Sequence, residues 1–248
     1  LNGLKNGLAC LLFLPVLLTI PWLDNKDAVI GLLLSGAIGI AAGDSFYLAA
    51  LRRLGTRRTL TVEALGPVLA SIGSVVMMGE MLSSRAWIGA ALVTVAVMLV
   101  AGSGEANSRD SAGVLLALTA VICGLTGAFL ARQVLISSGL SPIQTAAIRL
   151  LGGWLALLPV LVRNDINRKS FLATGRIRIL VATALGTNLG IALQQLVFQK
   201  MAVGPGVTLM STAPVMALCI GHWEGDPIQA RGVVAAGLAV AGVACISL

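Results

Sequence analysis

Long apolar runs, each close to the length that crosses a bilayer, are the feature that most constrains this chain. They consist of Leu, Ala, Val and Gly without the alternating polarity of membrane β-strands, so they predict helices of about 20 residues. Charged residues make up 11% of the sequence and gather between the runs, whereas a soluble domain carries about 25%. The sequence therefore predicts an all-α integral membrane protein. We place nine spans, at residues 4–23, 27–50, 60–79, 86–103, 112–133, 142–162, 177–199, 206–222 and 229–248.

Internal symmetry is the second strong feature of the sequence. Residues of the same kind recur after a shift of 144 to 147 positions. Five spans separate the members of each pair, and an odd number of crossings inverts the second copy relative to the first. This is the inverted repeat of many secondary transporters. The matched pairs include Lys5 with Arg149, Gly39 with Gly186, Gly43 with Gly190, Tyr47 with Gln194 and Pro67 with Pro214.

The repeat divides the chain into two parts. We assign residues 1–104 to a first copy with four helices and residues 111–248 to a second copy with five. The span at 112–133 has no partner in the first copy, so we expect a full-length protein with one more helix ahead of Leu1, ten in all. Because one chain contains both copies, a monomer is sufficient for function, although the oligomeric state stays open.

Short motifs follow one another in the same order in both copies. The first copy has the segment 47–51, then Leu65-Gly66-Pro67-Val68, then Gly79-Glu80 ahead of Gly89, and the second has Ala213-Pro214-Val215. In this order the motifs resemble the EamA-type branch of the drug/metabolite transporter superfamily. The resemblance implies ten helices around a central cavity, alternating access, and export of amino acids or other metabolites. It does not fix the substrate.

Two arguments about orientation disagree. Lys and Arg are most frequent in the loops after the second, fourth, sixth and eighth spans, and the positive-inside rule places those loops in the cytoplasm. Members of the resembled family usually have both termini in the cytoplasm, which implies the opposite arrangement. The absolute topology stays open.

Ionisable residues inside the spans are the first candidates for function. Each costs about 2.5–3.5 kcal/mol to insert at a helix centre, so such groups usually face a cavity or a partner. Asp44 is the best candidate for a proton or cation site, because apolar surroundings favour the neutral form of a carboxyl group. The alternative is a structural hydrogen bond or a pair with an arginine. For Glu63 we favour such a structural pair, and we interpret Arg149 and its mate Lys5 as anchors of span entrances.

Uncharged polar residues complete the predicted cavity. Tyr47 and Gln194 lie at equivalent depths in the two copies, where a phenol and an amide suit a polar metabolite in an apolar cavity. Hydrogen bonding between helices is the alternative. The hydroxyls of Thr208 and Ser211 are weaker candidates, because they often bond back to their own helix. The predicted lining is Asp44, Tyr47, Glu63, Asn188, Gln194, Gln195, Thr208 and Ser211.

Prolines and glycines predict where the helices bend and pack. Pro67 and Pro214 each remove a backbone hydrogen bond in mid-span, which predicts symmetric kinks with a role in gating. We interpret Glu80 as a structural cap at the end of its span. Small residues four apart favour close helix packing. They are Gly39, Gly43, Gly186 and Gly190.

These features together predict a secondary transporter of the inner membrane. We expect it to export a small polar or amphipathic metabolite by alternating access, with protons as the coupling ion through Asp44. Multidrug or cation efflux by the same fold is the alternative. A membrane-embedded enzyme is disfavoured, because one histidine and scattered acids provide neither an activated nucleophile nor a metal cluster. A channel is a third class.

The remaining partners follow from the same reading. We predict no catalytic residue, no metal and no cofactor, and the sequence has no Gly-rich phosphate loop that would couple transport to ATP. The net charge of +7 does not indicate nucleic-acid binding, because Lys and Arg gather in the loops of a membrane protein, where they set its orientation in the lipid bilayer.

Overall fold

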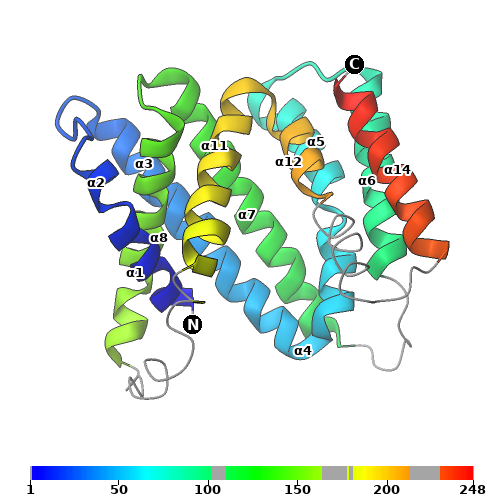
Figure 1. Cartoon of the computed structure of the whole chain (residues 1–248), viewed down its shortest axis with the longest axis horizontal. Coiled ribbons are helices and arrows are strands. Elements are labelled where there is room, and N and C mark those ends of the chain that lie inside the picture. Colours follow the sequence, from blue (N-terminus) through cyan, green and yellow to red (C-terminus); the bar gives the residue numbers. More distant parts are fainter. Residues whose placement is uncertain (1, 102–109, 164–177, 179–180, 213–229, 248) are drawn as a thin grey trace. The chain divides into compact units, whose positions relative to one another are not determined.

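The part of the chain that the structure describes is helical, which confirms the predicted all-α class. The computed structural model (Figure 1) describes residues 2–101, 110–163, 178, 181–212 and 230–247, and within them no residue belongs to a β-strand. Shorter apolar helices lie at Ser84–Leu99 and Ala230–Ile246. The described helices that are long and apolar enough to cross a membrane are Lys26–Thr56, Arg58–Met78, Ser111–Ser137 and Pro142–Val162.

The helices group into two compact units. Unit 1 comprises residues 1–45 and 122–200, and unit 2 comprises residues 46–121 and 201–248. Each unit therefore combines segments from both predicted copies of the repeat. The described elements of unit 1 are α1 (Asn2–Leu12), α2 (Leu14–Leu17), α3 (Lys26–Gly36), η1 (Ala37–Gly43), the second part of α7 (Ser111–Ser137), α8 (Pro142–Arg163), η2 (Thr183–Leu189) and α11 (Gly190–Lys200).

In unit 1, α1 lies antiparallel beside α8 (Figure 1). Gly3, near the start of α1, lies against Leu161, near the end of α8. At the other end of this pair, the Gln144 side chain donates a hydrogen bond to the Thr19 carbonyl over 3.3 Å. An apolar core forms between these segments and α3, and it buries side chains such as Ile148 completely. Close packing of this core holds the three helices in place, and with them the polar groups described below.

Glycines allow α3 and α8 to cross at backbone contact. A Cβ atom added to Gly152 would lie 2.6 Å from Leu33 Cα, closer than carbon atoms pack. Gly36 of α3 lies in the same way against the backbone of Arg149. One element further, a Cβ on Gly39 would lie 3.3 Å from Gly127 Cα on α7. The absence of side chains at this crossing brings Arg149 close to η1.

Two π-helical segments occupy matched places in the sequence. η1 contains Gly39, and η2 contains its repeat mate Gly186. A π-turn closes hydrogen bonds between residues five apart, and such turns inside α-helices are frequent at functional sites. Asp44 and Gly190, which follow the two segments directly, begin α4 and α11.

Unit 2 is built around a close pair of helices. Gly89 of α6 lies against Gly242 of α14, where an added Cβ would be 2.7 Å from the Gly242 carbonyl oxygen. Ala96 packs against Ala235 along the same two helices, which lie side by side in Figure 1. The described elements of unit 2 are α4 (Asp44–Glu63, from Phe46 on), α5 (Gly66–Met78), α6 (Ser84–Ala101), the first part of α7, α12 (Val203–Met210) and α14 (Ala230–Ser247).

The basic segment 51–59, expected as a loop, is helical. It continues α4 to Glu63, with an interruption at Gly55, whose φ of 74° suits a residue without a Cβ. Arginine and leucine are good helix formers, so this segment has no local reason to unfold outside the bilayer. The expected span at 4–23 is also divided, because α1 ends at Leu12 and the short α2 contains Pro15 in its first turn.

Candidate functional site

An ion pair joins α1 to the start of α4 in unit 1. Lys5 Nζ lies 2.7 Å from Asp44 Oδ2, and the two side chains are 37% and 38% exposed. The sequence left Asp44 open between a proton or cation site and a structural pair with an arginine. In the structure its partner is a lysine, the residue that we interpreted as an anchor of the first span.

Arg149 lies beside this pair and is almost completely buried. Its residue exposure is 3%, and the charge of Asp44 acts on it electrostatically. One terminal nitrogen donates a hydrogen bond to Gln194 Oε1 over 3.2 Å, whereas Nε has no partner among the described residues. The other terminal nitrogen lies beside Gly39, where an added Cβ would be 3.6 Å away, at ordinary contact distance. Gln194, predicted as a cavity residue, therefore contacts a buried cation.

Asparagines of α1 extend the cluster towards η1. The Asn2 side-chain amide donates to the Ile40 carbonyl of η1 over 3.3 Å and to Ser45 Oγ over 3.4 Å. Asn6 Nδ2 in turn donates to Asn2 Oδ1 over 3.3 Å. Sequence reasoning missed both residues. Their spacing of four residues, which places two amides on one face of a helix, was the available signal.

Two further predicted residues of unit 1 are buried amides with unused hydrogen-bonding groups. Asn188, in η2, donates to the Ala9 carbonyl over 2.9 Å, but its Oδ1 has no partner among the described residues. Gln195, in α11, is completely buried, and neither its Oε1 nor its Nε2 has a partner there. A buried amide without a partner costs about 1–3 kcal/mol, so both residues stay candidates for contact with a solute.

The other predicted cavity residues lie in unit 2. Tyr47 and Glu63 are half-buried on α4, and both interact with other residues. Thr208 bonds back to its own helix, as expected for a hydroxyl, with Oγ1 donating to the Gly204 carbonyl over 2.8 Å. Ser211 caps the C-terminus of α12 through its backbone. The residues predicted to line the cavity therefore belong to both units.

The predicted gating and capping residues lie at helix ends. Pro67 is in the middle of the apolar segment Arg58–Met78 but in the first turn of α5, directly after a break that follows Glu63. A proline fits there because the first turn of a helix needs no N–H donor. Glu80 follows Gly79, whose left-handed conformation ends α5, and its backbone N–H donates to the Ser74 carbonyl. Pro214 lies outside the described residues.

Among the matched glycines, the surroundings differ. Gly39 and Gly43 both lie against α7, with Gly127 and Cys123 as their respective neighbours. A Cβ on Gly186 or on Gly190 would meet no described atom within 4 Å. Among the matched glycines, those of the first copy therefore lie at a close approach of described helices, and those of the second copy do not.

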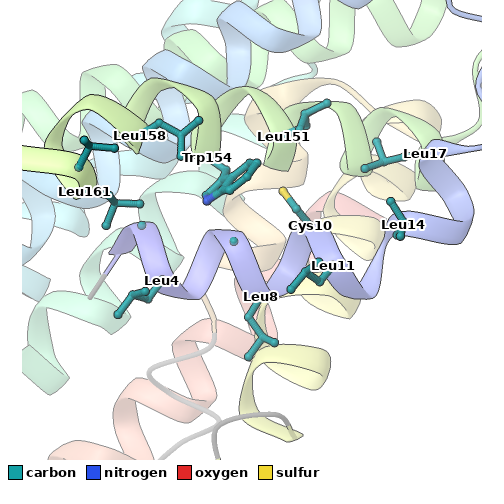
Figure 2. Close-up of a pocket in the computed structure, with 13 residues that line it drawn as sticks. Leu4, Leu8, Cys10, Leu11, Leu14, Leu17, Leu151, Trp154, Leu158 and Leu161 are labelled. Carbon is teal, nitrogen blue, oxygen red and sulfur yellow. The ribbon is translucent and has the colours of Figure 1, made fainter. Parts of the chain in front are cut away.

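A separate apolar groove lies between α1 and α8. Its volume is about 930 Å³. Figure 2 shows Trp154 and Cys10 pointing into the space between the two helices. None of the residues predicted to line the cavity borders this groove. Its walls suit an acyl chain or another apolar group, and they offer no charge to orient a polar metabolite.

Comparison with known proteins identifies a family and a similar fold. The model of the EamA-like transporter family matches residues 1–102 and 111–248. One similar solved structure is a crystal structure described only as that of a protein, with 16% identity and a TM-score of 0.76. The alignment covers 98% of this chain and 83% of that one, so the two share a fold. No curated protein matches.

The family match spans nearly the whole chain and agrees with its apolar helices and with the resemblance carried by its motifs. The chain therefore belongs to the EamA-like transporter family, and it is a membrane transporter of the drug/metabolite type.

Proposed function

We propose that the chain is a secondary transporter that exports a small polar or amphipathic metabolite across the inner membrane by alternating access. The observation that carries the proposal is the polar cluster of unit 1, defined by Lys5, Asp44, Arg149 and Gln194. It lies inside a helical unit of a transporter family member. Charges in such a place usually face a substrate path, because a purely structural contact can be made at lower cost by apolar groups.

The geometry of the cluster suits a site that opens and closes. The Lys5 and Asp44 side chains are each more than one-third exposed, so water, a proton or a solute can reach their ion pair. Arg149 beside them is buried. A solute or proton that replaces one partner of the pair changes the charge next to Arg149, which is how binding can favour one conformation over another.

Features of the two predicted copies support alternating access. Each copy has a π-helical segment at the matched place, η1 and η2. In unit 2 Gly89 lies against Gly242, and Ala96 and Ala235 belong to one buried cluster; the two pairs of positions correspond when the copies are shifted by 146 residues. Inverted repeats reach the two states of alternating access by moving one repeat against the other.

The proposal is tested by transport into proteoliposomes with Asp44→Asn and Lys5→Gln. We expect each change to lower the initial rate, and Asp44→Asn to remove the dependence of that rate on a pH gradient. The matched control is Asp110→Asn, which removes the carboxylate of the exposed Arg53–Asp110 pair in unit 2, with 3.7 Å between charged atoms. If Asp44→Asn transports at the wild-type rate with the wild-type pH dependence, coupling through Asp44 is wrong.

A further inference from the structure

The polar cluster of unit 1 carries an excess of positive charge. Lys5 and Arg149 bring two cations, and Asp44 is the carboxylate that interacts with both. Asp44 forms its close pair with Lys5, and among the described residues Arg149 has no ion pair within 4.0 Å. Among the residues that the structure describes, the nearly completely buried guanidinium of Arg149 therefore has no counter-ion of its own.

The hydrogen bonds of Arg149 are as incomplete as its charge balance. A guanidinium has five N–H donors in a planar fork, and the neutral amide of Gln194 accepts from one terminal nitrogen. Nε is buried and has no partner among the described residues. Leaving a donor of a charged group unpaired in the interior is costly, so the surroundings of Arg149 fit a missing acceptor.

The adjacent amide is in the same condition. Gln195 follows Gln194 on α11, is completely buried, and uses neither of its amide atoms among the described residues. Its Nε2 is a donor and its Oε1 an acceptor, so the amide can pair with either kind of group. A group with several acceptor atoms and a negative charge would complete the donors of Arg149, whereas a cation would not.

We propose that unit 1 binds the oxyanion of the transported metabolite, a carboxylate or a phosphate, at Arg149. This inference rests on the proposed transport function and names its substrate class. The guanidinium fork matches the planar carboxylate and the phosphate oxygens. The half-exposed Lys5–Asp44 pair forms the accessible side of the site, and Asp44 competes with the incoming anion for the two cations.

This competition gives the site a signature that a structural arginine lacks. Removing the charge of Arg149 weakens anion binding, whereas removing the charge of Asp44 strengthens it, because the cluster then holds two cations without a carboxylate. Cationic solutes respond in the opposite sense. Substituting a residue that only held helices together would not change whether the protein prefers anionic or cationic solutes.

The experiment measures equilibrium binding to the purified full chain in detergent with matched probes. Succinate is compared with succinamide, a neutral molecule of similar size, and glycerol 3-phosphate with glycerol, which lacks the phosphate group. Putrescine serves as the cationic probe. We expect one or both anions to bind, the neutral analogues to bind at least about tenfold more weakly, and Arg149→Gln to remove that difference.

Variants separate binding from folding. If Arg149→Gln fails to fold, Arg149→Lys keeps the charge without the fork, and we expect the affinity for the anion to fall severalfold. Asp44→Asn is expected to raise that affinity. The control Arg53→Gln, which removes the cation of the exposed Arg53–Asp110 pair in unit 2, is expected to leave it unchanged. Binding of putrescine in preference to both anions, or an affinity for anions that does not respond to Arg149 and Asp44, overturns the inference.

Transport is measured separately, so that the two proposals can fail independently. Anion binding that depends on Arg149, without uptake of that anion into proteoliposomes, refutes the transport of that substrate and leaves the site. Uptake of a neutral or cationic solute by a protein that binds no anion refutes the site and leaves the transporter.

Discussion

The crossing of α3 and α8 gives a prediction whose size follows from the structure. Gly152→Ala would place a Cβ atom 2.6 Å from Leu33 Cα, and carbon atoms prefer a separation of about 3.5 Å or more. Both atoms belong to or hang directly from the backbone, so no flexible side chain can turn away. The helices must therefore separate by about 1 Å.

The expected loss of stability combines two opposing effects. Overpacking of this kind costs about 1–3 kcal/mol, and the better helix propensity of alanine returns up to about 1 kcal/mol. A net loss of about 1–2 kcal/mol lowers the melting temperature by about 2–8 °C for a chain of this size. Because α8 carries Arg149, the same displacement lengthens its 3.2 Å hydrogen bond to Gln194 and should lower transport as well.

Thermal unfolding of the purified protein, followed by tryptophan fluorescence in detergent, measures this loss. The matched control is Gly237→Ala in α14, where an added Cβ meets no described atom within 4 Å. We expect the control to be neutral or to raise the melting temperature by a few degrees. Equal melting temperatures for Gly152→Ala and the wild type would refute the backbone contact between α3 and α8.

Three further predictions test other described residues. Gln195→Leu replaces a buried amide, which has no partner among the described residues, by an apolar side chain of similar size. We therefore expect the folded protein to be more stable by about 1 kcal/mol, with a higher melting temperature, and transport to be lower. A fall in melting temperature would contradict this. In a double-mutant cycle measured by thermal unfolding, with Lys5→Gln, Asp44→Asn and the double variant, each single change should destabilise the protein more than the double change. Added salt should reduce this difference because the pair is partly exposed. Additive effects would show that the two charges do not interact. Gly79→Ala should cost about 1 kcal/mol through its φ of 63° alone, whereas Gly79→Asn should cost less, and equal melting temperatures for both would rule out a left-handed residue at the end of α5.

The sequence contained most of the fold because the bilayer restricts what a chain can do. Apolar runs near 20 residues predict helices, and the described helices lie in the runs identified here, apart from the extension of α4 through the segment 51–59. Hydropathy does not report hydrogen-bond register, so the π-helical segments η1 and η2 could not be predicted. It also could not show that the basic segment around Gly55 continues α4. The arginines and leucines there favour a helix, but their charges end the apolar run from which hydropathy identifies one.

The site was predictable in its residue types and not in its pairings. Asp44 and Gln194 were identified because polar groups inside spans are costly. Their partners, Lys5 and Arg149, were identified through the repeat but interpreted as anchors of span entrances. A pairing depends on which helix faces meet, and that depends on backbone contacts such as the one at Gly152, which neither periodicity nor symmetry specifies.

The position of Asp44 directly after η1 has a mechanical consequence. Successive residues of an α-helix are rotated by about 100° around its axis. If one turn of η1 tightened from the π to the α spacing, the helix beyond it would advance by one residue, and Asp44 would swing by about that angle relative to α3. A change of one hydrogen-bond register would thus turn the carboxylate away from Lys5 without unfolding any helix. The Lys5–Asp44 ion pair would then stabilise the π-helical register of η1, and loss of the pair would favour the α-helical one.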